Sequence, residues 1–127
     1  MATVNWGKEG VVGAGMPPAL RPLLEEIVRR LVHGAYAELV RDGLAPLYTE
    51  AGLAQAVRAY PATLAPLGDE CWAAGYALPD GKMPGRWSIV LPLQTVEEGR
   101  SRFTLECLAW LTTAGTPRIE IDRLHTF

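Results

Sequence analysis

The sequence predicts an α+β domain in which N-terminal helices pack on a curved antiparallel sheet of about four to five strands. Three observations indicate this class. An amphipathic helical pattern occupies the N-terminal part of the chain, apolar residues alternate through the C-terminal half, and turn sequences separate the alternating segments. One apolar helix face can cover one face of such a sheet, which gives a domain of two layers.

The first helix is expected over 17–33, because apolar residues recur there at steps of three and four while charged residues occupy the opposite side. Its two leading prolines suit a first helical turn, where a missing N–H costs nothing. A second helix is predicted over 35–41 and a third over 49–60, with Thr49 as the N-cap. Residues 45–48 are interpreted as a short strand between the second and third helices.

The alternation over 86–111 predicts two long strands joined by a charged turn at 94–101. Further strands are expected over 70–78 and 118–122, and 124–127 is interpreted as a continuation of the last one. The expected inner face contains no acid or base, so a solid core is the simpler inference. Its members are Trp87, Ile89, Leu91, Leu93, Phe103, Leu105, Cys107, Ala109, Leu111, Ile119 and Ile121.

The length of 127 residues is that of about one domain. We divide the chain into a glycine-rich, flexible N-terminal arm at 1–16 and a single α+β domain at 17–127. A net charge of −2 and scattered arginines argue against a nucleic-acid binder. The sequence shows neither a membrane-spanning run nor a signal peptide, so a cytoplasmic protein is expected.

The two cysteines, Cys71 and Cys107, lie among apolar neighbours in predicted strands. They are too few for a disulfide framework, and we expect two buried, reduced thiols. With only two histidines, far apart in the sequence, a metal site is improbable, and no cofactor is expected.

Two segments resemble a family of small bacterial proteins of unknown function. LPLQTVEEGRSRFTLE is similar to the EEGRSDLTLE-type hairpin of that family, and IEIDRLHTF is similar to its DD(I/L)HVL-type C-terminus. In addition, LVHGAYAELV resembles the helix–Gly–helix corner of NTF2-like (cystatin-like), cone-shaped domains. The resemblance covers most of the chain from about Leu20. It implies an NTF2-like fold and supplies no activity.

The sequence departs from this family pattern at several positions. Gln94 stands for a tryptophan and Phe103 for a leucine, while Arg102 and Arg123 each stand for an aspartate. The two arginines change the local charge by four units. If those acids carry a function in relatives, this protein has lost or altered it.

Asp122 and His125 are candidate catalytic residues, because a carboxylate can orient an imidazole and make it a general base. NTF2-like enzymes of the isomerase, dehydratase or cyclase kind suggest such a pair, with Tyr36 or Tyr76 as hydrogen-bond donor in a ligand pocket. The structural alternative is that Asp122 caps or bridges at a strand end, that His125 packs at the chain terminus, and that both tyrosines lie at the core margin.

Glu98 and Arg100 flank Gly99 in the charged turn and are candidate ligand-binding residues. A guanidinium can bind a carboxylate or phosphate through two hydrogen bonds. The structural alternative is a turn in which Gly99 takes a positive φ while Arg100 pairs with Glu106 to hold the hairpin.

The outward-facing parity of the sheet contains Val90, Leu108 and Trp110, which make it more apolar than a solvated face requires. We therefore interpret these three residues as an interface. The leading hypothesis is an interaction protein with a protein partner: a homodimer, an immunity-type neutraliser of a toxin, or an accessory subunit. The alternatives are the enzyme described above and a passive carrier of a small-molecule ligand.

Overall fold

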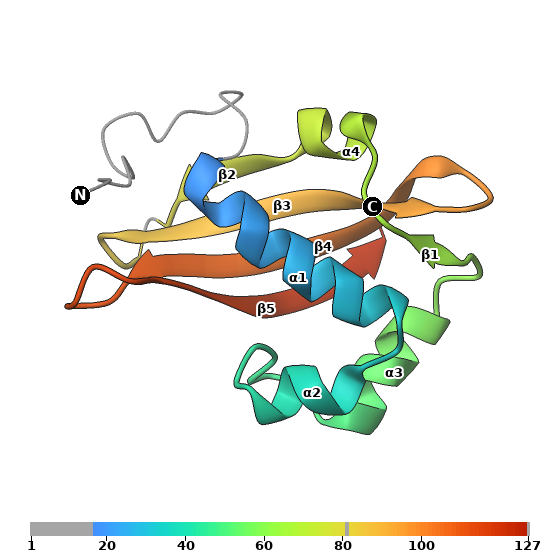
Figure 1. Ribbon diagram of the computed structural model, residues 1–127, viewed down its shortest axis with the longest axis horizontal. Coiled ribbons are helices and arrows are strands. Elements are labelled where there is room, and N and C mark those ends of the chain that lie inside the picture. The colour runs from blue at the N-terminus through green and yellow to red at the C-terminus, as the bar shows by residue number, and fades with distance from the viewer. Residues whose placement is uncertain (1–16, 81, 127) are drawn as a thin grey trace.

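The computed structural model describes residues 17–80 and 82–126 and confirms the α+β class (Figure 1). The expected arm at 1–16 lies outside the described residues. The helices are a 3-10 turn η1 (Pro18–Leu20), α1 (Arg21–Val32), α2 (Tyr36–Arg41), α3 (Glu50–Arg58) and α4 (Asp69–Ala74). The strands are β1 (Leu64–Ala65), β2 (Tyr76–Pro79), β3 (Arg86–Thr95), β4 (Gly99–Leu111) and β5 (Pro117–Thr126).

All strand pairs of the sheet are antiparallel, and β3 lies at its centre. On one side β3 pairs with β4, which in turn pairs with β5. On the other side β2 pairs with the first half of β3 and β1 with its last residues. Figure 1 shows α1 lying across one face of this sheet, with α2 and α3 beyond its C-terminal end.

The core lies between α1 and the face of the sheet that it covers. Leu24, Ile27 and Leu31 of α1 belong to one buried cluster with Ile89 and Leu91 of β3. Each large apolar side chain buried in this way contributes about 1.5–3 kcal/mol. All the predicted inner residues are buried except Leu111 at the end of β4, which is 36% exposed.

The segment predicted as a strand at 45–48 is a turn, and that prediction was wrong. The segment instead covers the free edge of β5. The backbone N–H of Ile121 donates to the carbonyl of Leu44 at 2.7 Å, and that of Leu124 donates to the hydroxyl of Tyr48 at 3.1 Å. These bonds satisfy edge groups that would otherwise need water.

The predicted strand at 70–78 is helix α4 followed by the shorter strand β2, so its first half was wrongly assigned. Cys71 and Trp72 are adjacent and both buried, whereas a strand would direct them to opposite faces. Gln94 of β3 holds this segment in place. Its carbonyl oxygen accepts from the N–H of Gly68 and from the thiol of Cys71, both at 3.3 Å.

Strand β5 continues through Asp122 to Thr126 and contains a bulge. Arg123 lies opposite Glu106, whereas Ile121 lies opposite Cys107, so Asp122 is an extra residue on β5. The extra residue shifts the alternation by one position. As a result, Leu124 is buried although its spacing from Ile121 is odd.

Glu26 binds two arginines on α1. We expect this contact to make an acid-sensitive contribution to stability. Its carboxylate accepts from Arg29 at 3.0 and 2.6 Å and from Arg30 at 2.7 Å. Hydrogen bonding by these guanidinium groups lowers the pKa of Glu26 from 4.5 to about 2. Because the folded pKa is depressed, this stabilisation is present above the unfolded pKa and is lost as the pH falls from 4.5 towards 2.

Glu26→Gln should therefore make the melting temperature fall less steeply over that pH window, as measured by circular dichroism. The neighbouring substitution Glu25→Gln is the matched control. Glu25 lies 3.6 Å from its partner Arg21, with both side chains about half exposed, and an exposed pair of this kind contributes little. Equal acid sensitivity of the Glu26→Gln variant and the wild type would contradict the prediction.

Candidate functional site

The face of the sheet opposite α1 is called the outer face below. Helices α1, α2 and α3 contribute their buried side chains to the core on the other face. Strand alternation places the following residues on the outer face: Tyr76, Leu78, Arg86, Ser88, Val90, Pro92, Gln94, Arg100, Arg102, Thr104, Glu106, Leu108, Trp110, Arg118, Glu120, Asp122, Arg123 and His125.

The three predicted interface residues lie together on this face. Val90, Leu108 and Trp110 are each half-buried, as are their apolar neighbours Tyr76 and Leu78 on β2. Tyr76 is the direct partner of Val90, whereas Leu108 adjoins Val90 only diagonally, because its direct partners are Ser88 and Glu120. Apolar side chains on a sheet face that no described helix of the N-terminal layer covers are typical of an interaction surface.

The predicted catalytic pair is arranged differently from the expectation. The Nε2 of His125 contacts the carboxylate of Glu106, the residue across from the bulge, and not that of Asp122. The same carboxylate accepts from Arg123 at 3.5 Å, so Glu106 has two basic neighbours. Asp122 makes no side-chain hydrogen bond or ion pair with another described residue. Glu106 therefore contacts His125 and Arg123 in place of Arg100, the partner considered from the sequence.

Two of the four predicted ligand-binding residues come together in a hollow on the outer face. Tyr76 and Arg100 line it, and its volume is about 340 Å³. Its apolar wall comes from the end of α4 and from β3. The complete lining is Ala74, Tyr76, Val90, Pro92, Arg100, Ser101, Arg102 and Thr104. It contains two guanidinium groups and no carboxylate.

Arg100 lies between this hollow and a second one lined by three acids. Asp69, Glu70 and Glu98 line the second hollow, yet Arg100 makes no ion pair with any of them within 4.0 Å. Among the described residues its side chain forms no hydrogen bond either. The acids therefore lie near Arg100 without occupying its hydrogen-bonding positions.

Glu98, the third predicted ligand-binding residue, holds the β3–β4 turn to the chain after α3. It accepts from the hydroxyl of Tyr60 at 2.7 and 2.8 Å and from that of Thr95 at 3.1 Å. The hydrogen bond to Glu98 raises the pKa of Tyr60, because only the protonated hydroxyl can donate it. Gly99 has φ of +74°, as predicted for this turn.

The fourth predicted residue, Tyr36, lies at the start of α2 and packs against the core. It therefore does not line the hollow with Tyr76. Cys71 and Cys107 are buried as predicted and form no disulfide. Burial raises the pKa of both thiols, which makes neither a reactive nucleophile.

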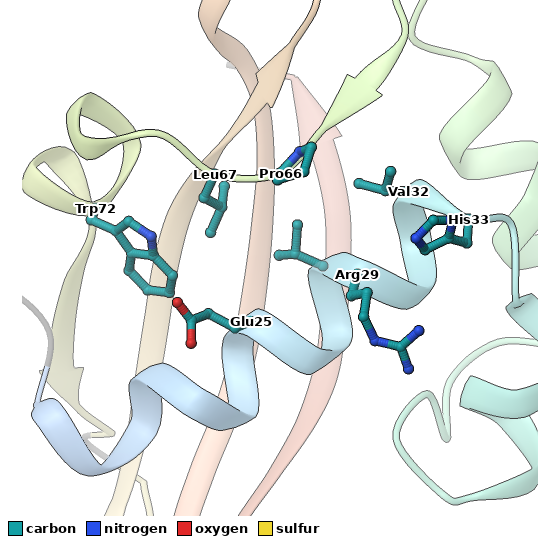
Figure 2. A pocket seen from close by; sticks show the side chains of 8 residues that line it. Glu25, Arg29, Val32, His33, Pro66, Leu67 and Trp72 are labelled. Carbon is teal, nitrogen blue, oxygen red and sulfur yellow. The ribbon is translucent and has the colours of Figure 1, made fainter.

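A separate pocket of about 220 Å³ lies in the helical layer, between α1 and the segment from β1 to α4 (Figure 2). Figure 2 shows Trp72, Leu67 and Pro66 on one side and Val32 on the other. No sequence pattern indicated this pocket, because Trp72 was assigned to a strand. Its volume is below the range of about 300–1,000 Å³ that is usual for ligand sites.

The charged rim of that pocket is largely neutralised within the chain. Arg29 is bound to Glu26, and Glu25 lies 3.6 Å from Arg21. Arg21 also lies over the ring of Trp72, 4.4 Å from its centroid, so the aromatic ring already has a cation partner. The outer face therefore offers the stronger candidate site.

No three His, Cys, Asp or Glu side chains among the described residues are placed to hold a metal ion. No helix in the same part of the chain is both long and apolar enough to cross a bilayer.

A family model described as a domain of unknown function matches residues 28–127. No curated protein and no solved structure gives a significant match.

Proposed function

The chain belongs to the family of domains of unknown function DUF7668, and from the surface of this member we propose its function. It is an interaction protein that forms a homodimer through the outer face. The observation that carries this proposal is the apolar patch of Tyr76, Leu78, Val90, Leu108 and Trp110 on that face. Half-buried apolar side chains across adjacent strands can be desolvated by a second flat surface.

The outer face is large enough for a small interface. Strands lie about 4.8 Å apart and rise about 3.3 Å per residue, so the three long strands β3, β4 and β5 measure roughly 14 by 33 Å, and β2 adds a short fourth strand. Two such faces together bury roughly 1,000 Å², which is just below the usual range for stable specific interfaces and is typical of a weak dimer.

The charges on β5 suit a second copy of the same surface. A two-fold interface brings one patch against itself, so the patch has to be complementary to itself. Strand β5 presents Arg118 and Arg123 together with Glu120 and Asp122. Because the strand carries both signs of charge, it suits a second copy of itself better than a partner of one charge sign.

Leu108→Asp should raise the dimer dissociation constant at least about 30-fold, because it introduces a charge into the centre of the patch, and this corresponds to a loss of about 2 kcal/mol. Leu47→Asp is the matched control, since Leu47 is 69% exposed in the loop between α2 and α3. Sedimentation equilibrium over a wide concentration range measures both, and circular dichroism verifies folding. Trp110→Ala provides a second, uncharged variant.

A wild-type chain that stays monomeric at every concentration would overturn the homodimer. It would leave the outer face to a foreign partner, as in the immunity-type and accessory-subunit hypotheses. A dimer that both Leu108→Asp and Trp110→Ala leave intact would instead show that another surface mediates association.

A further inference from the structure

The hollow lined by Arg100, Arg102 and Tyr76 has a chemistry that self-association does not explain. We infer that it binds a small organic oxyanion, a carboxylate or a phosphate ester attached to a compact apolar group. The hollow adjoins the apolar patch and shares Tyr76 and Val90 with it, whereas its two arginines lie beyond the patch, and Leu108 lies four residues from Thr104 on β4.

The charge of the lining determines the sign of the ligand. Arg100 and Arg102 both extend from the outer face of β4, and no acid lines the hollow. A guanidinium group presents its donors in a planar fork that matches the oxygens of a carboxylate or phosphate. Arg100 has its side-chain donors uncommitted to any described residue, so binding an anion there breaks no bond of the folded protein.

The hydroxyl groups around the hollow differ in whether they already donate a hydrogen bond within the protein. The hydroxyl of Thr104 donates to the carbonyl of Arg102 at 3.1 Å, and that of Ser101 donates to the carbonyl of Leu93 at 2.8 Å. The hydroxyl of Tyr76 makes no hydrogen bond with a described residue. Tyr76 can therefore add a donor to those of Arg100.

The apolar walls of the hollow determine the size and polarity of the group attached to the oxyanion. Ala74, Val90 and Pro92 form an apolar side, and the volume of about 340 Å³ lies near the lower end of the range for ligand sites. A single aromatic ring or a branched aliphatic group suits this space. Asp69, Glu70 and Glu98 line the neighbouring hollow on the other side of Arg100. Their negative charges disfavour an anion that extends past Arg100. They therefore restrict the oxyanion to the Tyr76 side.

The test is a titration of the full chain followed by ¹H–¹⁵N correlation spectra. The probes are 3-phenylpropanoate and phenyl phosphate, with 3-phenylpropanamide as the neutral analogue and 3-phenylpropylamine as the cationic one. Saturable shifts that centre on residues 100–104 and Tyr76 are expected with one or both anions. The two anionic probes distinguish a carboxylate ligand from a phosphate ester.

Arg100→Gln should weaken anion binding about tenfold, which is the effect of losing one charge-assisted hydrogen-bonding group. Arg118→Gln, an exposed arginine on β5 of the same face that does not line the hollow, should leave binding unchanged. Leu108→Asp should also retain binding, and this variant separates failure of the hollow from failure of the proposed dimer.

Three results would overturn the inference. One is the absence of saturable binding of either anion up to about 10 mM, a limit that corresponds to less than about 3 kcal/mol of binding free energy. Another is binding of the amide or the amine as tight as that of the anions. The third is equal weakening by Arg100→Gln and Arg118→Gln, which would indicate a general effect of net charge.

Discussion

Leu91→Ala is expected to lower the free energy of unfolding by about 3–5 kcal/mol. Leu91 is fully buried near the middle of β3, where its direct partner on β4 is Leu105. Pairing with β4 and the cover of α1 over the inner face hold the surrounding backbone in place, so the site cannot collapse around the missing atoms. The loss therefore includes a cavity in addition to the lost transfer free energy.

Urea denaturation measures this effect, and Leu47→Ala is the matched control. Leu47 is 69% exposed, so the same change of side chain should cost less than about 0.5 kcal/mol there. Similar losses for the two variants would show that the inner face is not the core of the domain.

Phe103→Ala is expected to lower the free energy of unfolding by about 3–5 kcal/mol. Phe103 is 2% exposed on the inner face of β4. Its ring stacks on that of Tyr60, with centroids 4.9 Å apart and an interplanar angle of 7°. The substitution therefore removes both core volume and the support for the chain after α3.

The substitution Phe103→Leu separates these two effects, and it introduces the residue found in the family pattern that this hairpin resembles. It keeps most of the apolar volume and loses the stack, so a cost of about 0.5–1.5 kcal/mol is expected. The same urea denaturation measures it. A cost as large as that of the alanine variant would mean that leucine cannot fill the site, and no cost at all would mean that the stack adds nothing.

The sequence predicted the long strands well because their alternation arises directly from the pleat. From Trp87 to Leu93 and from Phe103 to Ala109 every second side chain is apolar and buried. The helix at α1 and the Thr49 cap were predicted for the same reason, since each depends on residues close together in the chain. The side chain of Thr49 accepts from the N–H of Gly52 at 3.0 Å.

Helix α4 was missed because its sequence also fits a strand. Trp72 and Ala74 happen to continue the alternation of Tyr76 and Leu78, so the period alone could not reveal the break between them. The position of the break depends on Gln94, which is distant in sequence and binds the start of the helix. Contacts of this kind cannot be read from local periodicity.

The candidate site was predicted in part. Arg100 and Tyr76 were selected for their chemistry, and the pairing of β2 and β4 with β3 brings them to one hollow. The partner of His125 was not predictable, because a bulge at Asp122 sets which carboxylate it meets. The role of Glu98 also depended on a residue remote in sequence, Tyr60.

The two borders of the sheet have a consequence for how molecules of this protein can meet. One border consists of β1 and β2, which are short and separated by a helix, and the other is bonded to Leu44 and Tyr48. Such borders are poor templates for recruiting a strand from a neighbouring molecule. Concentrated solutions should therefore resist fibril formation, and the 4.7–4.8 Å reflection of cross-β deposits should emerge only after the native fold is lost.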